Sequence, residues 1–281
     1  MQNNTCVELR MDAPHISEDD FATLMSTFNA LGGSEESNQL TGQHERIAWF
    51  EVGANAEEQY KRLETAAALF GLQENQFSIN TLGDDWATAW QDHWTAMPIG
   101  KSLCVRPSFC EALPDRSIDV VLDPGQAFGT GTHPTTYLCL EAIEDYCLNH
   151  PPKSLLDMGA GSGLLAIAAA KMGALDVVCV DYDPLSVEAC EVNAGINNIS
   201  LTSILGDTPP AQTFELVVAN ILYNPLIDMV KPLVASVDKH LILSGILSEQ
   251  VPALIQAYAA HGLIHHNTRN KEEWAVVEFI R

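Results

Sequence analysis

Two aspartates and three glycines near the middle of the chain have the types and spacing of a nucleoside-binding site. Asp157 ends a short apolar run, and Gly159, Gly161 and Gly163 form a turn directly after it. Glycine in such a turn lets the backbone approach a ligand with no Cβ in the way. Asp181 ends the next apolar run, 22 residues after Gly159, where a carboxylate can accept hydrogen bonds from both hydroxyls of a ribose.

The details of this turn favour a sulfonium cofactor over a dinucleotide. Dinucleotide-binding turns carry a third glycine three residues after the second, and this chain has Leu164 there. Asp157 would repel a pyrophosphate, whereas the ammonium group of S-adenosylmethionine would attract it. We therefore interpret Asp157 as a cofactor contact rather than only a cap of the following helix. A nicotinamide-dependent oxidoreductase remains an alternative.

Asn220 is the candidate catalytic residue. It ends the apolar segment Val217–Ala219, and its side-chain oxygen can accept a hydrogen bond from a substrate amine and so orient the amine's lone pair. The same side chain could instead cap a helix that begins at Tyr223. Without the glycine turn, the cap would be the preferred interpretation.

A loop rich in glycine and threonine, residues 123–136, precedes a predicted helix. The start of that helix could present Thr135 and Thr136 to the cofactor. His133 in the same loop could serve as a base, but a single loop histidine is more often structural, and no Ser or Cys nucleophile pairs with it recognisably.

These candidates fall at the ends of apolar runs that alternate with amphipathic helices, which predicts a doubly wound parallel sheet covered on both faces. Ligands of such sheets bind at the carboxyl ends of the strands. The runs 264–268 and 274–280 can add an antiparallel hairpin. The expected strands are 154–158, 177–181, 201–205, 215–219 and 241–244, and the expected helices are 134–148, 163–172, 184–197, 223–236 and 249–261.

The first 82 residues have the order βαββαβ, which indicates a smaller ferredoxin-like domain. We expect its first helix to run through Leu31 and to end at Gly32 and Gly33, with a weak strand near Gln39 and Leu40 after it. A short connecting helix rich in tryptophan is expected over 84–94. The other expected elements are strands at 7–11, 46–52 and 77–82 and a helix at 56–70.

Charge and composition limit the possible partners. The formal net charge is −23, which argues against nucleic acid, because phosphate binding needs clustered Lys and Arg. The first 94 residues hold 16 acidic and 4 basic side chains, which would attract a basic partner. Seven cysteines without a CxxC pair indicate reduced thiols rather than a zinc site. No apolar run approaches a membrane span and no signal segment precedes the domain, so we expect a monomeric cytoplasmic protein without a metal.

The whole chain resembles the PrmA family, whose members methylate large-subunit ribosomal protein eleven. The loop GTGTHPTT is the most specific element of this resemblance. The matching segments are LDPGQAFGTGTHPTT (122–136), LLDMGAGSGLLAIAAAKMGA (155–174), VDYDP (180–184), ANILYNPL (219–226), LSGIL (243–247) and KEEW (271–274).

The resemblance implies a class I methyltransferase with a seven-stranded, mostly parallel sheet that transfers methyl groups to lysine side chains and an N-terminal α-amine. It implies a substrate-recognition domain at 1–82, a linker helix at 83–100 and a catalytic domain at 101–281. The implied S-adenosylmethionine contacts are Thr135, Thr136, Gly159, Gly161, Asp181 and Asn220. The family usually has a small pair where this chain has Tyr223 and Asn224, beside the acceptor amine.

Three alternatives differ from this prediction in substrate or in chemistry. The enzyme could methylate another protein or a small-molecule amine. It could be the nicotinamide-dependent oxidoreductase already mentioned, which would bind NADH but not S-adenosylmethionine. It could also be a binding module that retains the cofactor fold but transfers no methyl group.

Overall fold

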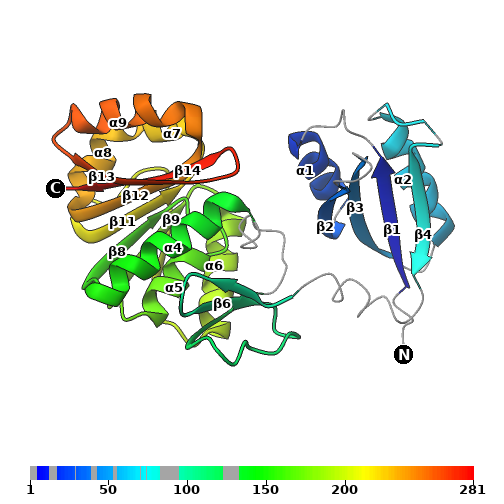
Figure 1. Cartoon of the computed structure of the whole chain (residues 1–281). Helices are drawn as coiled ribbons and strands as arrows, with labels where there is room; N and C mark the ends of the chain where they lie inside the picture. The colour runs from blue at the N-terminus through cyan, green and yellow to red at the C-terminus, as the bar shows by residue number, and fades with distance from the viewer. Residues whose placement is uncertain are drawn as a thin grey trace. The chain divides into compact units, whose positions relative to one another are not determined.

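The computed structural model of the chain describes residues 5–12, 18–28, 30–38, 43–52, 56–69, 71–73, 75–82, 95–122 and 133–281. The chain divides into two compact units, Met1–Trp94 and Thr95–Arg281. Each unit has its own β-structure and helices (Figure 1). In the part of the chain that the structure describes, no helix combines the length and the apolar character that a membrane crossing requires.

The first unit is an antiparallel sheet of four strands in the order β2-β3-β1-β4 with two helices. Alternate residues of the central strand, Val7, Leu9 and Met11, are fully buried and pack against Leu24 of the first helix and Leu63 of the second. The predicted ferredoxin-like order is confirmed. The elements are β1 (Thr5–Asp12), α1 (Glu18–Thr27), β2 (Ala30–Asn38), β3 (Gln43–Val52), α2 (Ala56–Leu69) and β4 (Phe77–Leu82).

The predicted end of the first helix is wrong. Helix α1 ends at Thr27, and Leu31, Gly32 and Gly33 belong to β2. A Cβ on Gly33 would meet the side chains of Met25 and Phe21. This glycine therefore allows α1 to pack closely on β2 rather than stopping the helix. Gln39 and Leu40, the expected weak strand, lie outside the described residues.

The second unit is built on a seven-stranded sheet in the order β10-β9-β8-β11-β12-β14-β13. Strands β8 to β12 run parallel to one another, whereas β14 runs antiparallel to both β12 and β13. The predicted doubly wound sheet with a closing hairpin is confirmed. The strands are β8 (Ser154–Met158), β9 (Asp176–Asp181), β10 (Thr202–Leu205), β11 (Phe214–Asn220), β12 (Val237–Leu247), β13 (Ile264–Lys271) and β14 (Trp274–Ile280).

Helices cover both faces of this sheet (Figure 1). Along β11, Leu216 and Val218 join the core beneath α4, α5 and α6, while Val217 and Ala219 join the core beneath α7, α8 and α9. This alternation explains why the strand reads as a continuous apolar run. The helices are α4 (Pro134–Asn149), α5 (Leu164–Lys171), α6 (Pro184–Ile196), α7 (Tyr223–Asp228), α8 (Val230–Ser236) and α9 (Val251–Ala259), and a 3₁₀ turn, η2 (Ser248–Gln250), precedes the last.

Two further predictions need correction. The single helix expected over 223–236 is two helices, because Pro232 has no amide hydrogen and its ring clashes with the carbonyl four residues earlier, at Asp228, where α7 ends. The linker helix expected over 83–100 is wrong at its C-terminal end. Met97–Ile99 form strand β5, which pairs with β6 (Leu103–Arg106) and, through it, with β7 (Ile118–Val121). Residues 83–94 lie outside the described residues.

Candidate active site

Asp157, the fourth residue of the five in β8, is a buried carboxylate with one oxygen unsatisfied. Its Oδ2 accepts a hydrogen bond from the amide of Ala166, 3.2 Å away in the first turn of α5. Its Oδ1 has no hydrogen-bond donor among the described residues, although the side chain is only 1% exposed. Burial, together with the nearby charge of Asp181, raises the pKa of Asp157 to about 7, while the Ala166 amide acts in the opposite direction. The carboxylate thus caps α5 with one oxygen and leaves the other able to accept a hydrogen bond from a ligand.

The glycine turn folds tightly between β8 and α5. Gly159 has φ +75°, and a Cβ there would overlap the side chain of Ile221. Its amide donates to the carbonyl of Val180, at 2.8 Å. A side chain at this position would be strained and would also collide with the segment that follows Asn220.

Asp181, at the end of β9, holds the other side of this turn. Its Oδ2 accepts a hydrogen bond from the Gly161 amide at 2.8 Å, and its Oδ1 accepts one from the Asp183 amide at 3.0 Å. Each carboxylate oxygen retains a second lone pair, which a ribose hydroxyl can use. Asp183 itself is the N-cap of α6 and accepts from Leu185, as the sequence predicts.

Asn220 and Thr136 lie together at the end of β11. The Asn220 amide nitrogen is 3.4 Å from the Thr136 hydroxyl, while its Oδ1 is buried and has no donor among the described residues. Leu222, not Asn220, is the N-cap residue of α7, and no side chain of the described residues caps that helix. The alternative interpretation of Asn220 as a helix cap is therefore wrong, and its carbonyl oxygen is available to a donor from a ligand.

His133 and Thr135 form a local cap at the start of α4. The Nδ1 of His133 accepts a hydrogen bond from the Thr135 amide at 3.3 Å and lies 2.7 Å from the Thr135 hydroxyl. This geometry agrees with the structural role preferred for His133. It turns the Thr135 hydroxyl toward His133, so Thr136 is the threonine that contacts Asn220. Residues 123–132, the rest of this loop, lie outside the described residues.

Gly245 supports the site and was not recognised from the sequence. Asn220 pairs with Ser244 on β12, and the next residue, Gly245, has φ +86°. A Cβ on Gly245 would overlap the backbone of Ile221. The signal was a glycine inside the apolar run LSGIL, because a glycine within a strand often marks a close backbone approach.

Tyr223 begins α7 and packs, half-buried, against the core beneath α7, α8 and α9, whereas Asn224 is exposed. Part of the Tyr223 side chain therefore packs against the hydrophobic core beneath these helices.

The site fits S-adenosylmethionine. The buried free oxygen of Asp157 suits an ammonium group, and the carboxylate of Asp181 suits a ribose. The pairing of Asp157 with Val218 on β11 sets Asn220 two positions further along the neighbouring strand, at the same edge of the sheet. The turn at Gly159 supplies a backbone surface without a side chain.

Comparisons with known proteins agree with this geometry. The sequence model described as "Ribosomal protein L11 methyltransferase (PrmA)" matches residues 9–281. A ribosomal protein L11 methyltransferase of Ralstonia pickettii is 40% identical and covers 89% of either chain. One from Geobacter sulfurreducens is 36% identical over 91% of this chain and 86% of its own.

A solved structure has the same fold and a related sequence. The ribosomal protein L11 methylase of Lactobacillus delbrueckii subsp. bulgaricus aligns with a TM-score of 0.61 and 31% identity, over 67% of this chain and 99% of its own. The family match over nearly the whole sequence and the donor set at the strand ends lead to the same conclusion. The chain belongs to the ribosomal protein L11 methyltransferase family, and S-adenosylmethionine is its cofactor.

Proposed function

We propose that this methyltransferase acts on amines of free ribosomal protein L11, at lysine side chains and at the N-terminal α-amine. The observation that carries the proposal is a pair of buried oxygens, Asp157 Oδ1 and Asn220 Oδ1, on the adjacent strands β8 and β11. Neither oxygen has a donor in the part of the chain that the structure describes. One is anionic when ionised and suits the cofactor's ammonium group. The other is neutral and suits an amine that must keep its lone pair free.

The cofactor, when bound, supplies an electrophilic methyl group, and the chain's residues position the amine that accepts it. Asn220 Oδ1 accepts a hydrogen bond from the amine, which directs the remaining lone pair away from the strand end. Thr136, at 3.4 Å from the Asn220 amide nitrogen, restricts the rotation of that side chain. The proposed cofactor contacts in the glycine turn are Gly159 and Gly161, whose backbone the cofactor would approach, and Asp181 is the proposed contact of its ribose. Thr135 and Thr136, at the start of α4, are two further proposed contacts.

The acceptor must lose a proton before it reacts. A lysine with an ordinary pKa of about 10.4 is neutral in roughly 0.04% of molecules at pH 7, equivalent to about 4.6 kcal/mol. Asn220 cannot accept a proton, and Nδ1 of His133 is directed at Thr135. We therefore assign proton loss to solvent, before the amine enters the site.

The acidic N-terminal part of the chain gives a physical reason to expect a basic protein as the substrate. Residues 1–82 are proposed to recognise the basic ribosomal protein, 83–94 to connect, and the unit Thr95–Arg281 to catalyse transfer. The 16 acidic and 4 basic residues of positions 1–94 favour a basic protein over a nucleic acid. A cytoplasmic monomer that meets its substrate before ribosome assembly fits this assignment.

The proposal is tested by transfer of radiolabelled methyl groups from S-adenosylmethionine to recombinant L11, with a whole-cell lysate assayed alongside. We expect L11 to be labelled, and to be the main labelled band in the lysate. Labelling of other lysate proteins or small amines with unlabelled L11 would disprove the substrate assignment. Binding of S-adenosylmethionine with no transfer to any acceptor would instead indicate a binding module.

A further inference from the structure

We infer that the C-terminal hairpin β13–β14 fixes the position of α4 and thereby holds Thr136 against Asn220. Lys271 and Trp274 of this hairpin are positioning residues for methyl transfer. The inference rests on the proposed function. It assigns a role to the segment KEEW (Lys271–Trp274), which no contact of the cofactor or acceptor explains.

The hairpin contacts one side of α4 at three levels. Arg269 pairs with Asp145, and Lys271 lies over the ring of Tyr137. Trp274 meets the ring of His133. The partners are spaced by four and then eight residues, so they extend from the N-cap of α4, His133, to Asp145, four residues before the helix ends. The hairpin thus limits both the rotation and the axial movement of α4.

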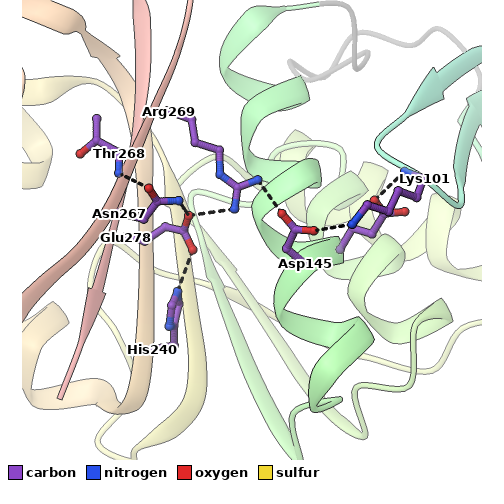
Figure 2. Close-up of polar contacts among 8 residues, drawn as sticks. Lys101, Asp145, His240, Asn267, Thr268, Arg269 and Glu278 are labelled. Carbon is purple, nitrogen blue, oxygen red and sulfur yellow. Dashed lines mark hydrogen bonds and ion pairs between the residues drawn. The ribbon is translucent and has the colours of Figure 1, made fainter.

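Away from its tip, the hairpin is held to α4 by a buried charge, the carboxylate of Glu278 (Figure 2). Glu278 of β14 is 4% exposed and accepts hydrogen bonds from Arg269 at 3.1 Å and Asn267 at 3.0 Å, and its other oxygen lies 3.1 Å from His240 Nε2. The second nitrogen of Arg269 reaches Asp145 on α4 at 2.8 Å. Burial would raise the pKa of Glu278, but the His240 hydrogen bond and the Arg269 charge keep it lower than usual. Glu278 is therefore ionised and holds the guanidinium between β14 and α4.

The tip of the hairpin, Lys271–Trp274, lies beside the candidate active site. Trp274 pairs with Leu247 at the end of β12, so the tip of the hairpin is at the carboxyl edge of the sheet, where Asn220 ends β11. The Trp274 and His133 rings meet edge to face, with centroids 4.7 Å apart. The Lys271 ammonium lies 4.2 Å from the centre of the Tyr137 ring.

These two contacts flank Thr136 in the sequence of α4. The amides of Thr136 and Tyr137 both donate to the carbonyl of His133, at 3.1 Å each. Movement of His133 therefore moves the first turn of α4 and changes the 3.4 Å approach of Thr136 to Asn220. Because a small displacement of a positioning group lowers the rate of transfer more than it lowers binding, the tip should affect kcat more than cofactor affinity.

The test uses Trp274→Ala, Trp274→Phe, Lys271→Ala and Lys271→Arg in the full chain. Ile264→Ala is the matched control, because Ile264 is 61% exposed at the opposite end of β13. We expect Trp274→Ala to lower kcat for L11 on the order of tenfold and Lys271→Ala by a smaller factor. The conservative changes Trp274→Phe and Lys271→Arg should retain most of the rate, because they keep a ring or a cation. S-adenosylmethionine affinity should fall by a smaller factor than kcat in each variant.

Hydrogen exchange gives a second measurement that does not depend on the substrate. The Thr136 and Tyr137 amides should exchange faster in Trp274→Ala, but not in Ile264→Ala. Unchanged exchange in a folded Trp274→Ala protein would overturn the inference, as would an equal fall in kcat and cofactor affinity. If the unmodified enzyme fails to methylate L11 but its α4 amides respond to Trp274→Ala, the proposed substrate is wrong. The inference that the hairpin fixes the start of α4 would then still stand.

Discussion

Among single residues, Asp157 connects cofactor binding most directly to pH. Its Oδ1 has no donor among the described residues, and burial raises its pKa to about 7. An ammonium group beside this oxygen would favour the ionised carboxylate. Binding of the cofactor should therefore be coupled to loss of a proton from this carboxyl group.

Cofactor affinity should consequently rise with pH. Between pH 6 and pH 8 the ionised fraction of a group with this pKa increases about tenfold, and the affinity for S-adenosylmethionine should increase by a similar factor. Calorimetric titration at the two pH values measures this. In Asp157→Asn, which can still accept from Ala166, the affinity should be lower and nearly independent of pH. The same pH dependence in the variant and the unmodified enzyme would exclude Asp157 as its source.

The stability of the free enzyme should change in the opposite direction. The folded-state pKa lies above the ordinary value of 3.8, so the native state binds this proton more tightly than the unfolded chain does. Stability contributed by this group is complete below pH 4 and is lost as the pH rises to about 7. Free Asp157→Asn should therefore unfold at a higher temperature than the unmodified enzyme at pH 8, and the difference should shrink toward pH 4.

At the scale of elements, Gly245 determines how closely β12 approaches the turn after Asn220. Gly245→Ala combines a left-handed backbone (φ +86°) with an overlap on Ile221. Gly262 has a similar φ of +95°, and no atom of the described residues lies within 4 Å of its Cβ position. Gly262→Ala therefore carries only the backbone strain, about 1–2 kcal/mol.

Gly245→Ala should therefore cost about 1–3 kcal/mol more than Gly262→Ala in denaturant unfolding, since the overlap must be relieved by shifts of the backbone. It should also lower methyl transfer strongly, because Ile221 follows Asn220, whereas Gly262→Ala should retain activity. Equal activity losses in the two variants would show that Gly245 serves the fold alone.

The elements also show what could be predicted from sequence. Strands β8, β9 and β14 were predicted nearly to the residue, because strands buried on both faces form continuous apolar runs. Asp157, Asp181 and Asn220 were found because strand ends meet at one edge of a parallel sheet. Both the strand boundaries and the residues at the strand ends could be predicted because they depend on patterns within short stretches of sequence.

The predictions failed where tertiary packing decides between local alternatives. Gly33 resembles a helix stop, but it makes room for Met25 against the sheet. Strand β5 has only three residues, Met97–Ile99, which is too short for a periodic pattern. The contacts of Trp274 and Lys271 with α4 join segments more than 130 residues apart, and no spacing in the sequence indicates them.

For the whole molecule, the net charge of −23 should affect substrate binding and not cofactor binding. Exposed charges separated by more than about 8 Å are screened at physiological ionic strength. The KM for L11 should therefore rise as sodium chloride is raised from low to high concentration. The affinity for S-adenosylmethionine, bound against the buried Asp157, should change much less. A KM for L11 that does not respond to salt would remove charge as the basis of substrate recognition.

The central claim is that Asn220 positions an amine of L11 for methylation. Intact-mass spectrometry of L11 after incubation with enzyme and S-adenosylmethionine tests it most directly, with peptide mapping of the modified amines. Gln256→Ala is the control, because Gln256 carries the same amide group and is exposed on α9. We expect whole-methyl mass increments on lysine and N-terminal amines with the unmodified enzyme and with Gln256→Ala, and a rate lower on the order of 10²-fold with Asn220→Ala. An L11 mass that stays unchanged with cofactor bound, or an Asn220→Ala enzyme as fast as the control, would contradict it.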